Sequence, residues 1–149
     1  MAPTPAPGNW SIESVSDGDT VRITNGRNTE RIRLCGIDAP EKAQERGKEA
    51  RDHLVELVRD RTIRPYFVER DKYGRQVAEL FAIDETGEVF VNEEMARSGL
   101  AWHYARYSGN CPNRDAIAAA SELAIAQRAG VHGDAGAIAP WEWRRQNKR

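Results

Sequence analysis

The octapeptide SDGDTVRI, Ser16 to Ile23, places two aspartates around a glycine at the start of a segment with strand character. Asp-Gly is a strong turn signal, because aspartate hydrogen-bonds to its own backbone and glycine accepts a positive φ. Val21 and Ile23 then alternate with polar residues, as in a strand with one buried face. A turn needs only one aspartate, so the second, Asp19, is left without a role. Taken alone, an acidic turn exposed to solvent is the simpler explanation.

Further strands are predicted on both sides of this stretch. Residues 9–16 alternate before the turn, and residues 30–38 alternate after a second turn sequence, NGRN. Pro40 ends the third strand, because the residue before a proline is pushed toward extended geometry. Residues 62–70 and 76–84 form two more strand-like segments on either side of the turn sequence DKYG. The sequence therefore predicts five short strands.

Three helices are predicted between and after these strands. Apolar residues repeat at helical spacing from about Gln44 to Asp60. A short helix capped by Asn92 ends at Gly99, and an alanine-rich helix capped by Asn113 ends near residue 130. One helix inserted after the third of five strands is typical of a small closed sheet of the OB type, in the α+β class. A generic α+β sheet is the alternative.

The composition fits one globular domain. The 149 residues are 40% hydrophobic and 30% charged, with 22 basic and 23 acidic side chains and a net charge of −1. The net charge therefore argues neither for nor against a nucleic-acid partner, and any basic binding surface has to be local. No run of eighteen apolar residues is present, so no membrane span is predicted. We expect a monomer without membrane contact.

The two ends differ from this domain. Residues 1–9, MAPTPAPGN, are rich in proline and are predicted as a disordered arm, residues 10–145 as the domain, and residues 146–149 as a basic tail. The tail either attracts phosphate or is simply solvated. The first residues lack the apolar segment of a signal peptide, so a secreted protein would have lost its signal before this sequence begins.

Several acids and arginines lie at strand ends and turns: Asp17, Asp19, Arg33, Asp38, Glu41 and Arg75. Each has a simple explanation, such as an acidic turn, an exposed strand residue or an acid near a helix N-terminus. Together, the carboxylates can converge on a hard cation such as calcium. Two arginines suit a phosphate, and a glutamate can orient or deprotonate a water. This combination predicts hydrolysis of a phosphodiester.

Three segments, DGDTVRI, RIRLCGIDAPE and DKYGRQVAELF, resemble the signature segments of the staphylococcal nuclease, or thermonuclease, family, and PWEWRR is similar to the tail of its bacterial members. The resemblance covers about Trp10 to Arg145. It implies an OB-fold-like five-stranded β-barrel with three helices. It also implies calcium-dependent cleavage of DNA and RNA at the bond between phosphorus and the 5′ oxygen, which leaves 3′-phosphate ends.

The resemblance implies a calcium site made by Asp19, Asp38 and the main-chain carbonyl of Ala39, with Asp17 close to it. Ala39 stands where the staphylococcal enzyme has threonine, a change that should be tolerated because the family uses the main chain there. Glu41 matches the carboxylate beside the attacking water.

The resemblance assigns Arg33 and Arg75 to the phosphate, and Tyr73 and Tyr107 to the nucleotide pocket, where a base would stack on the rings. The segment KAQERG after Glu41 is shorter than the mobile loop of the staphylococcal enzyme, and so is the hairpin before residue 71. We expect these differences to affect substrate binding rather than the chemistry.

Strict alternation would place Arg33 and Asp38 on opposite faces of the third strand. We therefore expect a bulge or twist near Gly36, or an Asp38 that lies beyond the ladder.

Cys35 and Cys111 are the two cysteines of the sequence. The family fold brings their regions to the same side, so a disulfide is one hypothesis, and a buried free Cys35 with an unrelated exposed Cys111 is the other. A disulfide would favour a secreted or periplasmic location, with the cytoplasm as the alternative.

A non-catalytic nuclease-like module that binds nucleic acid or protein is the alternative function. Such modules have lost catalytic residues, whereas this sequence keeps the full set of Asp19, Arg33, Asp38, Glu41 and Arg75. A metal-free OB fold that binds DNA would leave the acid cluster unexplained, since carboxylates repel phosphates.

Overall fold

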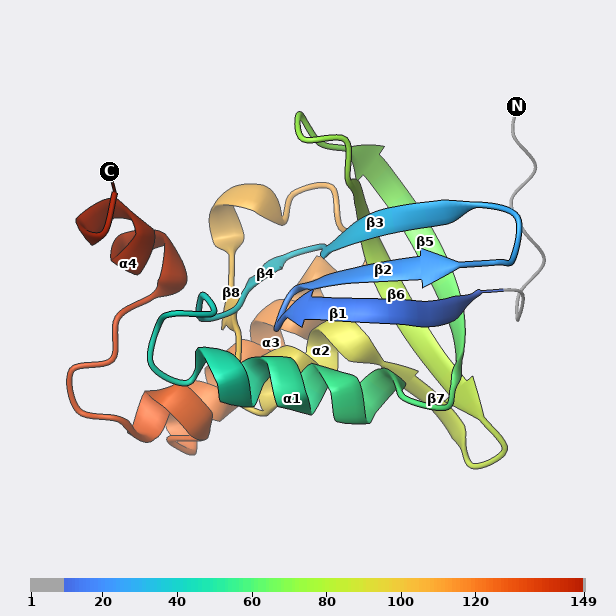
Figure 1. The fold of residues 1–149 in the computed structure, drawn as a ribbon. Helices are drawn as coiled ribbons and strands as arrows, with labels where there is room; N and C mark the ends of the chain where they lie inside the picture. The colour runs from blue at the N-terminus through green and yellow to red at the C-terminus, as the bar shows by residue number, and fades with distance from the viewer. Residues whose placement is uncertain (1–9, 149) are drawn as a thin grey trace.

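The structure, a computed structural model, describes residues 10–148 and consists of a main sheet with helices packed against it (Figure 1). The main sheet has six strands: β1 (Ser11–Asp17), β2 (Thr20–Thr24), β3 (Thr29–Leu34), β5 (Thr62–Arg70), β6 (Gln76–Asp84) and β7 (Gly87–Phe90). A second sheet pairs β4 (Ile37–Asp38) with β8 (Trp102–His103). The arm predicted at residues 1–9 lies outside the described residues, as does residue 149.

Four α-helices accompany the sheets: α1 (Gly47–Val58), α2 (Val91–Arg97), α3 (Arg114–Ala126) and α4 (Pro140–Gln146). Two short 3₁₀ helices, η1 (Ala105–Tyr107) and η2 (Gly130–Gly133), lie in the connections. The first three helices pack below the main sheet, whereas α4 lies at the edge of the molecule on the side of β4 and β8 (Figure 1). The predicted α+β class is confirmed, with one helix more than expected. No helix within residues 10–148 combines the length and the apolar character that crossing a membrane requires.

The strand order of the main sheet is β1-β2-β3-β6-β5, and β7 pairs with the later part of β6. Strands β3 and β6 run parallel, with Ile32 opposite Gln76, and the other neighbours are antiparallel. The five predicted strands are present. The end of the third forms the separate β4, and β7 and β8 were not predicted.

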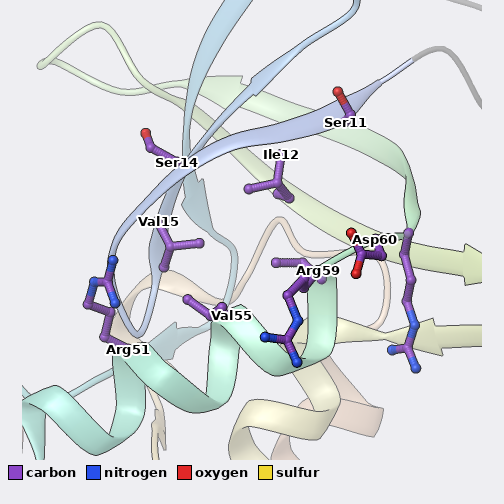
Figure 2. A pocket seen from close by; sticks show the side chains of 10 residues that line it. Ser11, Ile12, Ser14, Val15, Arg51, Val55, Arg59 and Asp60 are labelled. Carbon is purple, nitrogen blue, oxygen red and sulfur yellow. The ribbon is translucent and has the colours of Figure 1, made fainter.

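The arrangement is consistent with the predicted OB-like fold, except that the main sheet is not closed into a barrel. Within residues 10–148, the outer strands β1 and β5 approach through an isolated bridge between Trp10 and Ile63. Strand β1 has two register shifts between residues 12 and 17, and such irregularities twist a strand out of line with its neighbours. A hollow of about 410 Å³ lies between β1, the later half of α1 and residues 59–61 (Figure 2).

One core joins the sheet to the helices. Val21, Ile23 and Ile32 point from the sheet toward Leu54 of α1 and Met95 of α2, and all five side chains are buried. The alternation predicted for the second and third strands therefore gives the buried face of the sheet.

The side chains of the two predicted cap residues make no capping hydrogen bonds. Asn92 lies inside α2, where its side chain accepts from the amide of Leu80 and donates to the carbonyls of Cys35 and Ala78. Asn113 is the N-cap residue of α3 as predicted, but its side chain makes no capping hydrogen bond, because its amide and side chain both donate to the buried carboxylate of Glu79. Both asparagines are thus used to satisfy buried polar groups between elements, a long-range role that capping statistics do not foresee. Helix α3 ends at Ala126, before the predicted residue 130.

The third strand breaks at Gly36. This residue has φ +80°, and a Cβ there would lie 3.1 Å from Ile117, so the position favours glycine. The chain then enters β4, and Asp38 lies beyond the β3 ladder. Next to the break, Cys35 and Cys111 form a disulfide with a Cα–Cα distance of 6.0 Å.

Candidate functional site

The turn between β1 and β2 is fixed by packing. A Cβ on Gly18 would lie 2.7 Å from that of Ala39 and 2.8 Å from that of Ala50, so only glycine fits between the two segments. Gly18 has no positive φ, which corrects the reason expected from the sequence. Asp17 accepts a hydrogen bond from the amide of Asp19, as an aspartate in a turn does.

The side chain of Asp19 leaves this turn and is buried, with 6% of the residue exposed. Its Oδ2 accepts from the amide of Ala39 at 2.8 Å, and its Oδ1 accepts from the hydroxyl of Thr20 at 2.9 Å. Asp19 therefore connects the start of β2 to the segment that follows β4. The second aspartate of the opening octapeptide belongs to the interior of a site.

Arg33 lies between the two buried aspartates. Its Nη1 is 3.3 Å from Oδ2 of Asp19, and its Nη2 is 3.3 Å from Oδ1 of Asp38, whose residue is 0% exposed. Nη1 also donates to the carbonyl of Ile37 at 2.9 Å. The break at Gly36 brings β4 back toward the Arg33 side chain, so the structure unites two residues that strict alternation would separate.

A second arginine, Arg144 of α4, completes the cluster. Its Nη2 donates to Oδ2 of Asp38 at 2.6 Å, and its Nη1 donates to Oδ1 of Asp38 at 3.1 Å and to Oε1 of Glu41 at 2.6 Å. The sequence did not point to this residue, because PWEWRR contributed only to the family resemblance and no role at the site was assigned to its arginines. The proline and tryptophans of PWEWRR, which start and anchor a helix, were the available signal.

Negative charge is crowded at this point. Burial, followed by the charge of Asp19, raises the pKa of Asp17 to about 7. Burial also raises the pKa of Asp38, against the opposing effect of Arg144 and Arg33. Burial acts in the same way on Asp19, but there the charge of Arg33 and the hydrogen bonds outweigh it and lower the pKa. The positive charge of the neighbouring arginines is thus too small to offset the burial of Asp17 and Asp38.

Arginine side chains separate these carboxylates, and within residues 10–148 no three His, Cys, Asp or Glu side chains form a ready-made metal cage. The donor set still fits a hard divalent cation. It offers oxygen ligands, and within residues 10–148 the four carboxyl groups of Asp17, Asp19, Asp38 and Glu41 outnumber the two guanidinium groups of Arg33 and Arg144 that pair with them.

The guanidinium of Arg75 pairs with Asp71, which is not one of the acids of the cluster. Val77 of β6 is the register partner of Arg33 of β3. Arg75 lies two residues before Val77, so alternation places its side chain on the same face of the sheet as Val77 and Arg33. Its guanidinium donates to Asp71 at 2.8 Å. The structure therefore puts Arg75 on the Arg33 face of the sheet but holds it in the turn before β6.

The two predicted pocket tyrosines are exposed. Tyr73 is 62% exposed in the turn between β5 and β6, beneath the guanidinium of Arg75 at 5.3 Å from the ring centre. Tyr107 is 60% exposed in η1, and its ring meets that of Tyr104 edge-on at 4.9 Å. Tyr104 stacks in turn on Trp141 of α4 at 5.0 Å. Both tyrosines thus lie exposed on loops beside the sheet, each with a basic side chain over its ring, Arg75 over Tyr73 and Arg106 over Tyr107.

Comparison with known proteins agrees with this architecture. The family model for staphylococcal nuclease homologues matches residues 31–133. The chain belongs to the staphylococcal nuclease family. The match contains Arg33, Asp38, Glu41 and Arg75, whereas Asp19 precedes it and Arg144 follows it.

Similar proteins carry names of the same kind. The chain is 36% identical over 133 residues to a protein of Escherichia coli named "uncharacterized endonuclease", with 89% of this chain and 82% of the relative covered. It is 34% identical over 142 residues to a micrococcal nuclease of Shigella flexneri, with 92% and 80% covered. It is 38% identical over 119 residues to a staphylococcal-like nuclease of Arabidopsis thaliana, covering 80% of this chain and 34% of that protein.

Proposed function

We propose that this staphylococcal nuclease homologue is a calcium-dependent nuclease that hydrolyses DNA and RNA. The bond between phosphorus and the 5′ oxygen is broken, and the products carry 3′-phosphate ends. The family membership and the names of the relatives support a nuclease. The observation that carries the proposal is the position of Arg33 between the buried carboxylates of Asp19 and Asp38, with Glu41 adjacent to them through Arg144.

Asp19 and Asp38, with the main-chain carbonyl of Ala39, are the residues that would hold calcium, and Asp17 would add negative charge nearby. When bound, the ion would supply positive charge to a phosphate oxygen. The excess of carboxyl groups over guanidinium groups in the cluster supports a cation, and the oxygen donors support calcium.

Arg33 and Arg75 donate to the non-bridging oxygens of the phosphate. Their contribution grows as negative charge builds up on phosphorus in the transition state. Glu41 accepts a proton from the attacking water while the water oxygen forms the new bond to phosphorus. The 5′ oxygen leaves and takes up a proton. Tyr73 and Tyr107 offer their exposed rings to the bases.

The proposal is tested by incubating the purified protein with plasmid DNA, and with RNA, in calcium, in magnesium and in a chelator. We expect degradation in calcium, little in magnesium because that ion requires near-octahedral geometry, and none with the chelator. The products should need phosphatase treatment before a polymerase can extend their 3′ ends. Cleavage that survives the chelator contradicts the proposal, and so do products with free 3′ hydroxyls. Binding of nucleic acid without cleavage would support the non-catalytic module instead.

A further inference from the structure

The oxygens that would bind a cation are already engaged by arginines of the chain. Oδ2 of Asp38 accepts from Arg144, and Oδ1 accepts from both Arg144 and Arg33. The Glu41 carboxylate also accepts from Arg144. Arg33 belongs to the sheet and has a proposed role on the phosphate, but Arg144 comes from the last helix, 106 residues from Asp38. Its guanidinium bridges the proposed metal ligand and the proposed base.

Helix α4 has few other fixed contacts. Pro140 is its one buried residue among those described, and the side chain of Arg144 itself is 39% exposed. Trp141 stacks on Tyr104 and meets Trp102 edge-on at 6.4 Å, and the carbonyl of Ile138 accepts from Gln44 at 2.8 Å just before the helix. A cavity of about 210 Å³ is lined by Gln44 and Trp102 of the body of the protein, by residues 136–138 before α4, and by Trp143 of α4. The helix is thus held mainly by the ring contacts of Trp141 and by the Arg144 ion pairs.

Earlier in the same segment, a different anchor keeps the chain in place. Arg46, beside the start of α1, donates to both oxygens of Asp134 at 2.5 and 2.8 Å. This pair does not include the acids of the site. The segment up to Ile138 therefore stays attached when the Arg144 contacts are broken, and only α4 has to move.

We infer that Arg144 is a tethered cation that competes with a divalent ion for Asp38 while it also holds Glu41, and that binding of the ion releases α4. This inference rests on the proposed calcium site and adds a regulation to it. A guanidinium and a divalent cation repel each other at the same carboxylates, so occupancy by one disfavours the other. The helix is then an intramolecular inhibitor, and its release frees both the metal ligand and the base.

The coupling has to be reciprocal. If docking of Arg144 weakens cation binding by some factor, cation binding weakens docking of Arg144 by the same factor. If Arg144 is docked in about nine of ten molecules, the apparent affinity for the cation is about tenfold lower than the intrinsic affinity.

The inference is tested by calcium titration calorimetry on the wild type, Arg144→Gln and Arg145→Gln, without nucleic acid. Arg145 is the matched control, because it is adjacent in α4 and pairs only with Glu142 among the described residues. We expect Arg144→Gln to bind calcium about tenfold more tightly than the wild type. Arg145→Gln should stay within about twofold of the wild type, since its charge lies outside the cluster.

A second measurement follows α4 itself. Amide hydrogen exchange of residues 140–146 in the wild type should become faster when calcium is added, and in Arg144→Gln it should be fast with and without calcium. Equal or weaker calcium binding by Arg144→Gln overturns the inference while leaving the proposed function intact. Unchanged protection of α4 in the calcium-bound wild type does the same. Absence of calcium binding in all three proteins overturns the proposed site, and the inference with it.

Discussion

Arg33 on β3 and Asp19 at the start of β2 are ion-paired, with 3.3 Å between the guanidinium and the carboxylate. The pair arises from the antiparallel register, which sets Arg33 opposite Thr20, the residue after Asp19. The second guanidinium nitrogen reaches Asp38. One planar side chain therefore orients the two buried acids and keeps a partly exposed edge, which suits it to a phosphate bound beside a cation.

Replacing either phosphate-binding arginine by lysine should separate charge from geometry. We expect Arg33→Lys and Arg75→Lys each to lower kcat by about a hundredfold or more, equal to about 2.7 kcal/mol, because lysine keeps the charge but loses the planar fork. KM should change much less. Arg22→Lys, on the exposed part of β2, is the matched control. A higher KM with unchanged kcat at both positions would show ordinary ground-state binding and remove the arginines from the mechanism.

The crowded carboxylates give the metal-free protein a specific pH dependence. The pKa of Asp17 is about 7 in the folded protein, against an ordinary value of 3.8 for an aspartate that is not perturbed. Between these values the folded state keeps a proton that the unfolded state releases, so stability is lost as pH rises through this window.

The variant Asp17→Asn cannot lose that proton. We expect it to gain stability relative to the wild type between pH 4 and pH 8, by at most about 4 kcal/mol, the equivalent of the full pKa difference. Urea unfolding in a chelator at both pH values measures this gain. A stability difference that does not change with pH would mean that Asp17 is not perturbed.

The disulfide between Cys35 and Cys111 should stabilise the fold strongly. It closes a loop with a sequence separation of 76, for which the chain-entropy model gives about 4 kcal/mol. We expect the double variant Cys35→Ala, Cys111→Ala to unfold at correspondingly lower urea, and the reduced wild type to behave in the same way. The unreduced wild type should show no titratable thiol when denatured. Two thiols under those conditions would disprove the bridge.

Much of the sheet could be predicted from local sequence. The segments 20–24, 62–70 and 76–84 agree with β2, β5 and β6 because alternation and turn residues act over a few positions. The open edge between β1 and β5 and the need for a glycine at position 18 depend on packing between distant segments. Local patterns carry no information about such contacts.

The site divides in the same way. The acids and Arg33 were found because the resemblance covers contiguous motifs, and the break at Gly36 explains how Arg33 and Asp38 meet. Arg144 was not found, because its partner lies 106 residues away and α4 is too short to give a periodic signal. Asn92 was assigned to a cap, since only the folded chain reveals the buried carbonyls that it satisfies.

The central claim is that a cation held by Asp38 drives cleavage, and the initial rate of calcium-dependent cleavage by Asp38→Asn tests it most directly. Asp52→Asn, an exposed acid of α1, is the control. With the fold intact by circular dichroism, we predict that Asp38→Asn loses roughly two orders of magnitude or more in rate, because an anionic ligand is removed, while Asp52→Asn cleaves like the wild type. Near wild-type cleavage by Asp38→Asn in calcium would contradict the account.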